Sequence, residues 1–168
     1  TAAEHDRATN FAVTLMEQLV VPTFVLDAEQ RVLIWNQACE RLTGIPAREV
    51  IGTRDHWRAF YDSPRPCLAD LVARNDWSLI DKLYTTHDEP NTPAHGVHAE
   101  NWCTMPRRNK QLYLVVDAGP VFDEAGKLIA VVETLRDNTE NKLIQIKVSE
   151  QASLLQHHYD EHEREAKM

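Results

Sequence analysis

The fold is predicted by the segment TFVLDAEQRVLIWNQACERLTG, residues 23–44. It begins with two apolar runs separated by four polar residues at 27–30, a pattern that is typical of a β-hairpin. Asn36 then offers a helix N-cap, and Gly44 stands where a glycine commonly ends a helix. The segment therefore predicts two adjacent strands followed by a helix over Gln37–Leu42.

Upstream of the hairpin, the sequence predicts a short amphipathic helix. Between residues 10 and 20, apolar side chains recur every four residues, at Phe11, Leu15 and Leu19. This spacing places them on one face of a helix, which Pro22 ends. Residues 1–9 are polar and are expected to be irregular.

Downstream of the hairpin, the pattern is helical for about forty residues. A turn of helix is predicted over Ala47–Ile51, because a proline precedes it and a glycine follows it. Residues 53–92 contain no clear strand pattern, and spaced leucines and isoleucines predict two helices that separate near Asn75. The loop His87–His95 follows, with two prolines.

The rest of the chain up to residue 140 predicts three more strands. Residues 123–126 join the last two of them as a hairpin turn that resembles the turn at 27–30. The predicted strands are Thr23–Leu26, Arg31–Trp35, Val97–Met105, Gln111–Val116 and Leu128–Leu135.

The C-terminal segment predicts a long helix. Residues 140–168 contain no glycine or proline and are rich in Glu, Gln, Lys and His. Spacings of four and three connect a heptad-like stripe of Ile144, Val148, Gln151, Leu155, Tyr159 and His162. Since an isolated helix of this composition is marginally stable, we expect it to pair with another chain.

Composition excludes several classes of protein. The 168 residues suit one domain with an appendage, and 43% hydrophobic with 26% charged residues exclude wholesale disorder. A net charge of -8 argues against nucleic acid as a partner. The most apolar stretch, 11–26, is interrupted by polar residues and a proline, so no membrane contact is expected. Three cysteines without a CxxC pair indicate reduced thiols and a cytoplasmic protein. The sequence is expected to be part of a longer protein.

Motifs at both ends of the central region resemble PAS domains, the sensory modules of bacterial signalling proteins. FVLD at 24–27, VLIWN at 32–36 and NQACERLTG at 36–44 resemble the opening hairpin and first helix of that family. FDEAGKLI at 122–129, followed by ETLRDNTE at 133–140, resembles its last hairpin and its closing D-x-T-E motif.

This resemblance implies an α+β fold with a five-stranded antiparallel sheet in the order 2-1-5-4-3 and short helices on one face. It divides the chain into an N-terminal flanking helix (1–21), a PAS domain (22–140) and a C-terminal signalling helix (141–168). It also implies a sensor whose pocket passes a signal to an output domain, which could be a diguanylate cyclase, a chemoreceptor or a kinase. Asp137 and Thr139 stand at the junction and are the predicted relay residues.

Aromatic residues around one arginine make the middle segment the candidate ligand site. A pocket lined by aromatic side chains suits a small molecule, and an arginine in its lining favours a carboxylate or a phosphate as the ligand. Plain core packing explains the same residues equally well, with Arg65 holding a helix end or pairing with Asp70 or Asp81. The candidate set is Trp57, Tyr61, Arg65, Trp77 and Trp102, completed by Val116 and Glu133 on the last two strands.

Cofactor motifs are sparse. Light-sensing relatives use a cysteine in an N-C-R-F-L-Q segment, which neither Cys39 nor Cys67 matches, and the C-x-x-C-H motif of c-type haem is absent. Non-covalent haem b needs one histidine in an apolar pocket, for which His87, His95 and His98 are the candidates. Zinc bound by His95, His98 and Cys103 is disfavoured, because positions 98 and 103 of one strand face opposite ways.

No catalytic constellation stands out, so this chain is not expected to be an enzyme. The leading hypothesis is a small-molecule sensor that forms a homodimer through its terminal helices. The alternatives are a ligand-free dimerisation and relay module, and a haem-binding gas or redox sensor.

Overall fold

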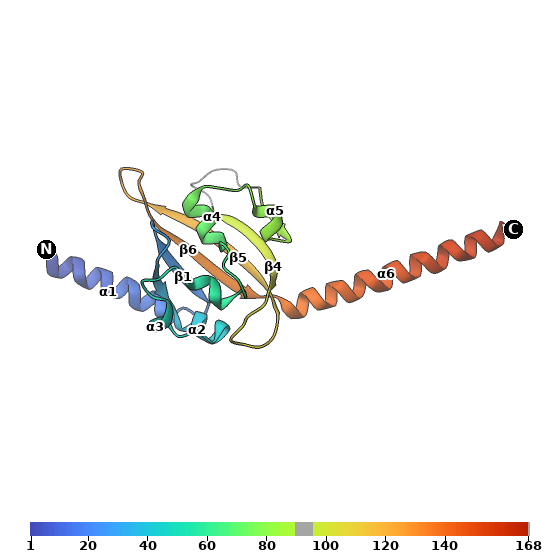
Figure 1. The fold of residues 1–168 in the computed structure, drawn as a ribbon, viewed down its shortest axis with the longest axis horizontal. Helices are drawn as coiled ribbons and strands as arrows, with labels where there is room; N and C mark the ends of the chain where they lie inside the picture. Colours follow the sequence, from blue (N-terminus) through green and yellow to red (C-terminus); the bar gives the residue numbers. More distant parts are fainter. Residues whose placement is uncertain (90–95, 168) are drawn as a thin grey trace. The chain divides into compact units, whose positions relative to one another are not determined.

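A computed structural model describes residues 1–89 and 96–167 (Figure 1). Its helices are α1 (Ala2–Gln18), α2 (Gln37–Thr43), α3 (Ala47–Val50), the 3₁₀ helix η1 (His56–Ala59), α4 (Leu68–Arg74), α5 (Ile80–Leu83) and α6 (Thr139–Ala166). Its strands are β1 (Thr23–Asp27), β2 (Val32–Trp35), β3 (Thr86–His87), β4 (Val97–Cys103), β5 (Leu112–Phe122) and β6 (Leu128–Asp137).

The strands form one antiparallel sheet in the order β2-β1-β6-β5-β4-β3. The expectation of five strands was therefore wrong, although the order of the other five strands agrees with the prediction. The added strand is β3, whose two residues pair with Glu100 and Ala99 at the edge of β4. Two residues are too few to produce a periodic signal in the sequence.

Both predicted hairpin turns are built in the same way. The carboxylate of Asp27 accepts the backbone N–H groups of Glu29 and Arg31, each at 2.9 Å. Asp123 does the same for Ala125 and Lys127. An aspartate that bonds to the backbone two residues on favours such a turn. The turns differ at the residue with left-handed backbone, which is Gln30 (φ 67°) in the first and Gly126 (φ 84°) in the second.

Asn36 joins three elements at the start of α2. Its side-chain oxygen accepts the N–H of Cys39 at 2.9 Å, as a helix N-cap does, and the N–H of Thr23 at 3.0 Å. Its amide nitrogen donates to the carbonyls of Met16 in α1 and Val21. The predicted cap therefore also fixes where α1 ends and β1 begins.

Helices α2 to α5 lie on one face of the sheet (Figure 1). The core between the helices and the sheet is packed with large side chains, among them Phe24, Trp35, Phe60, Leu68 and Leu135. Residues of β4 alternate between buried and half-buried, so that Val97, Ala99, Asn101 and Cys103 face this core. The positions between them face the opposite side of the sheet.

The two terminal helices leave most of their large apolar side chains exposed. Residues 1–9, expected to be irregular, form the first turns of α1, where Thr1 and Glu4 make a reciprocal capping box. The chain divides into two compact units after Asp137, and the second contains α6, a helix of 28 residues without a buried side chain. Among the described helices, none has the length and apolarity needed to span a membrane.

Candidate functional site

Two hollows flank Trp57 on the helical side of the domain. We call the larger one, of about 360 Å³, the Trp57 pocket; it is lined by Ile45, Glu49, Val50, Asp55, Trp57, Arg58, Tyr61, Asp62, Pro106 and Arg107. We call the second, of about 270 Å³, the arginine groove; it is lined by Gln30, Arg54, His56, Trp57, Pro64, Arg65, Pro66, Asp70 and Arg74.

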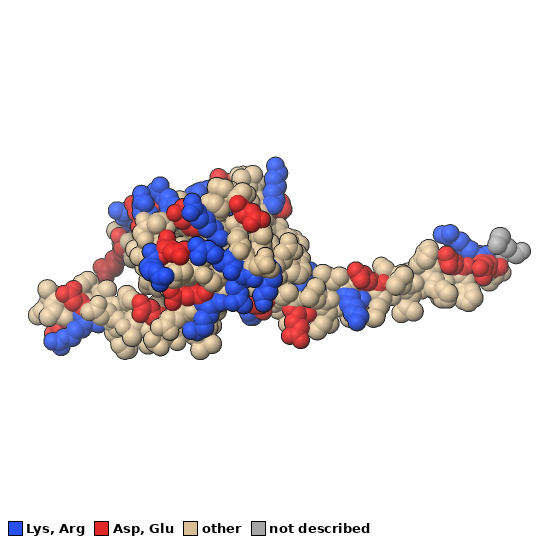
Figure 2. Space-filling model, turned by 60° about the horizontal axis from the view of Figure 1, so that its bottom comes forward, with Lys and Arg blue, Asp and Glu red and all other residues tan. Residues whose placement is uncertain are grey.

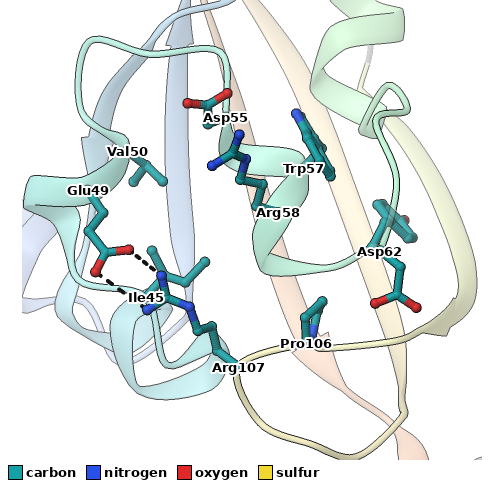
Figure 3. A pocket seen from close by; sticks show the side chains of 10 residues that line it. Ile45, Glu49, Val50, Asp55, Trp57, Arg58, Asp62, Pro106 and Arg107 are labelled. Atoms are coloured by element: carbon teal, nitrogen blue, oxygen red, sulfur yellow. Dashed lines mark hydrogen bonds and ion pairs between the residues drawn. The ribbon is translucent and has the colours of Figure 1, made fainter.

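The Trp57 pocket has a mixed charge. Figure 3 shows Glu49 of α3 facing Arg107 of the β4–β5 loop, with Arg58 and Trp57 of η1 opposite them. Arg107 Nη2 lies 2.7 Å from Glu49 Oε2, so these two charges neutralise each other. Three carboxylates and two guanidinium groups line the pocket, which gives it no preference for an anion.

The arginine groove has a different electrostatic character. The Nε–H of Arg54 donates to the backbone carbonyl of Glu29 at 2.8 Å, and the Nε–H of Arg74 donates to the amide oxygen of Gln30 at 2.9 Å. Both partners are neutral and belong to the β1–β2 turn. Over the described residues, neither these arginines nor Arg65 forms an ion pair.

Arg65 is the most enclosed of the three arginines. Its Nε–H donates to the carbonyl of Pro66 and its Nη1 donates to the carbonyl of Leu83, at 3.1 and 2.9 Å. The guanidinium carbon lies 3.8 Å from the centroid of the Tyr61 ring and 5.0 Å from that of Tyr84. The remaining nitrogen, Nη2, is buried without a hydrogen-bond partner. Arg65 thus carries a structural role and still has an unused donor.

A buried cluster of His56, Cys67 and Asp70 lies beside the groove. His56 Nε2 is 2.8 Å from Asp70 Oδ2, and the same oxygen accepts the N–H of Cys67 at 2.8 Å. Asp70 therefore holds η1 against the beginning of α4. Ligand atoms of the three residues lie within 4.8 Å of one another, and burial raises the pKa of the Cys67 thiol well above its usual value. The thiol is consequently neutral in this structure.

Glu133 places a carboxyl group in the core, where β6 passes α4. It is 2% exposed, and its Oε1 accepts the N–H of Ala69 at 2.7 Å. Burial raises its pKa to about 8, aided by Asp70 and opposed by the Ala69 hydrogen bond and by Arg65. At neutral pH this carboxyl group is therefore mostly protonated.

The structure brings some of the predicted ligand residues together and separates others. Trp57 lines both hollows, Tyr61 lines the pocket and Arg65 lines the groove, whereas Val116 belongs to the core beneath the helices. Trp77 lines neither hollow, and its indole N–H donates to Asn75.

Trp102 lies on the other face of the sheet. In β4 it occupies a position between the core-facing residues Asn101 and Cys103. There its ring packs edge-on against Tyr113, with centroids 5.3 Å apart. Trp102 is therefore not part of either hollow.

The described haem candidates have both ring nitrogens engaged. His87 Nε2 lies 2.6 Å from Asp81 and its Nδ1 lies 2.9 Å from the carbonyl of Asp88. His98, on the face opposite Cys103, lies between Glu100 and Asp117, 3.0 Å from each. An axial bond to iron would have to displace one of these contacts. His95 lies outside the described residues.

The predicted relay residues flank the junction between the two units. Asp137 is the last residue of β6, and Thr139 is the first residue of α6. Between them, Asn138 is the N-cap, and its side-chain oxygen accepts from the Nδ2 of Asn141.

Sequence reasoning missed three residues of the groove and its floor. Arg54 and Arg74 were not singled out, because only the fold brings them to Arg65 through the β1–β2 turn. His56 was missed as well, and Asp70 was considered only as an ion-pair partner of Arg65, whereas it bonds to His56. The available signal was the recurrence of arginines at 54, 65 and 74 beside predicted helix boundaries.

Comparisons with known proteins agree with this architecture. The chain matches the family described as "PAS fold" over residues 10–137. Phytochrome B-2 from Glycine max is 24% identical over 132 residues, which cover 79% of this chain and 10% of that protein.

Two solved structures show a similar fold at low identity. An RNA-binding light-oxygen-voltage receptor has a TM-score of 0.62 at 22% identity. The match covers 90% of this chain and 38% of the receptor chain. The PAS domain of Bordetella pertussis BvgS has a TM-score of 0.53 at 18% identity. The match covers 87% of this chain and 98% of the BvgS domain. The family match spans most of the chain, and the chain therefore belongs to the PAS family of sensory domains.

Proposed function

We propose that this PAS domain senses a small anionic molecule bound in the arginine groove and signals through α6 to an output domain. The observation that carries the proposal is the set of three arginines around one hollow, none of which forms an ion pair within the described residues, while Asp70 of the same lining is engaged by His56. A guanidinium group presents a planar fork of donors that matches a carboxylate or a phosphate.

The size and charge of the groove support a compact ligand. Its volume of about 270 Å³ lies near the lower end of the range for small-molecule sites. Arg54 and Arg74 each use only Nε in the hydrogen bonds described above, and Arg65 adds a buried nitrogen, Nη2, that has no hydrogen-bond partner. Such a site suits a di- or tricarboxylate or a phosphorylated metabolite.

The position of the groove supports a route for the signal. Arg65 and Asp70 influence the pKa of Glu133, which belongs to the strand that leads into α6. An added negative charge in the groove changes the same electrostatic balance. The proposal includes the relay of the signal through Asp137 and Thr139 to a diguanylate cyclase, chemoreceptor or kinase. It also places the domain in the cytoplasm and assigns no catalysis to this chain.

The second candidate function is a ligand-free module for dimerisation and relay. It is favoured by the exposed apolar residues of α6, which include Ile144, Val148 and Leu155, at 55 to 72% exposure. Binding of haem b, the third hypothesis, would require the histidine contacts described above to open.

Substitution of the groove arginines tests the anion proposal. At 100 times its dissociation constant, a bound anion should stabilise the domain by about 2.7 kcal/mol. Arg54→Ala and Arg74→Ala should each abolish most of this gain, because each removes a guanidinium group that uses only its Nε–H within the protein. Arg65→Ala should in addition destabilise the unliganded domain by about 1–3 kcal/mol, since it strands two backbone carbonyls. Thermal melts with phosphate, pyrophosphate and citrate measure both effects.

Arg107→Ala is the matched control, because it removes an arginine of the neighbouring Trp57 pocket. It should leave the response to anions unchanged. If none of the anions raises the melting temperature of the unmodified domain, the ligand-free relay module replaces the sensor. An equal loss in Arg107→Ala would show that the groove has no special role.

Truncation of α6 tests the proposed homodimer. A chain ending at Glu140 lacks the apolar residues of α6, each of which is worth about 1.5–3 kcal/mol when buried. The dimer should therefore dissociate at a higher protein concentration after truncation. Sedimentation equilibrium on both chains measures this change. A monomer at about 100 μM for the full chain would reject the dimer, and an unchanged affinity would assign the interface to α1.

A further inference from the structure

Two histidines lie one turn apart near the end of α6. The ring centroids of His158 and His162 are 5.6 Å apart. Histidines at positions i and i+4 share one face of a helix, which is the arrangement in which two imidazoles bind one metal ion. Over the described residues, His158 has no hydrogen-bond or ion-pair partner.

The neighbouring side chains favour a cation at this position. Nδ1 of His162 lies 3.8 Å from a carboxylate oxygen of Glu165. At this distance Glu165 forms no hydrogen bond with the ring, but it places a negative charge beside it. Residues 160–165 carry four carboxylates and one arginine, so the potential here is negative.

The heptad register places these histidines on the apolar face of α6. When His158 is taken in place of Tyr159 in the heptad-like stripe, a strict alternation of four and three runs through Ile144, Val148, Gln151, Leu155, His158 and His162. Residues at such positions face the partner helix in a parallel two-stranded coiled coil. Residues 151–159 also carry no charged side chain, and Figure 2 shows α6 with an uncharged stretch between its charged segments.

We propose that a divalent transition-metal ion, with zinc as the best fit, binds between two copies of this chain through His158 and His162 of each. Zinc prefers four ligands in tetrahedral geometry, and the two histidine pairs supply four neutral imidazoles. This proposal rests on the homodimer through α6 and adds a site that is incomplete without the second copy.

The site would make the pairing of the two α6 helices depend on zinc. Without a metal, two consecutive core layers of the coiled coil contain polar rings, which weakens the helix pair at its C-terminal end. With zinc bound, the same rings become a cross-link between the helices. Zinc would therefore strengthen the dimer through α6.

Calorimetric titration of the full chain with zinc chloride tests the site. We expect one zinc ion per two chains in the unmodified protein. In His158→Ala/His162→Ala, binding should weaken by more than about 100-fold, because even the outer partners of metal ligands are worth about 10–100-fold. His157→Ala is the matched control, since His157 faces Glu161 at 3.2 Å and lies outside the stripe. It should bind zinc as the unmodified chain does.

Sedimentation equilibrium in EDTA and in zinc separates this proposal from the homodimer itself. Zinc should tighten the dimer of the unmodified chain and leave that of the double variant unchanged. A dimer in EDTA that does not bind zinc overturns the metal site and keeps the homodimer. Zinc bound to a monomer, or retained by the double variant, overturns the shared site. A chain that is monomeric in both solutions overturns both proposals.

Discussion

Glu133→Gln should remove most of the loss of stability that the domain shows as the pH rises from 4.5 to 8. In the unfolded chain a glutamate loses its proton near pH 4.5, whereas in the folded domain the pKa of Glu133 is about 8. Between these values the folded state binds one more proton, so its stability falls as the pH rises. At about 1.4 kcal/mol per pH unit, the full loss approaches 5 kcal/mol. The neutral amide of glutamine avoids this loss and keeps an oxygen for the Ala69 N–H.

Urea unfolding from pH 4.5 to 9 measures this effect. The variant should exceed the original protein in stability by several kcal/mol above pH 8 and by little at pH 4.5. Glu124→Gln, in the exposed turn between β5 and β6, is the matched control and should change neither curve. A variant that keeps the original pH dependence would show that Glu133 is charged in the folded protein.

Asp70→Ala should cause a large loss of stability through a different mechanism. Its carboxylate is the acceptor for both His56 and the N–H of Cys67 in a buried environment. Removing one partner of a buried pair costs about 3–5 kcal/mol, because the remaining polar groups lose their acceptor without gaining water. Asp70→Asn retains an oxygen acceptor and should lose less.

Asp76→Ala provides the comparison from the same segment of the chain. Asp76 is exposed, and among the described residues its carboxylate accepts hydrogen bonds from Ser78 alone, within the same turn. Its removal should cost less than about 1 kcal/mol. Equal losses at positions 70 and 76 in urea unfolding would contradict the role of Asp70 in joining η1 to α4.

Local chemistry explains which parts of the fold were predictable. The aspartate turns, the Asn36 cap and the left-handed Gly44 act within a few residues of the chain, and the structure has each of them. The capping box of Thr1 and Glu4 is equally local, yet the polar residues around it concealed the start of α1. In contrast, β3 forms only because β4 offers a free edge, which no short segment encodes.

The same distinction holds at the candidate site. Arg65 stood out because aromatic residues surround it in sequence, whereas Arg54 and Arg74 reach it only through the fold. Trp102 was expected to face the core because it is apolar. In β4 the core-facing position belongs to the polar Asn101, and Trp102 lies on the opposite face of the sheet. The core accommodates Asn101 by hydrogen bonds to Tyr61 and to the Leu83 carbonyl.

The left-handed backbone of Gln30 has a consequence for the position of Arg74. A residue with a side chain in this conformation is strained by about 1–2 kcal/mol, and the equivalent turn at the other hairpin avoids the strain with Gly126. Glycine at position 30 would relax the turn, but it would also remove the amide that holds Arg74. The strained conformation at position 30 thus keeps the side chain that holds the guanidinium group of Arg74 in place.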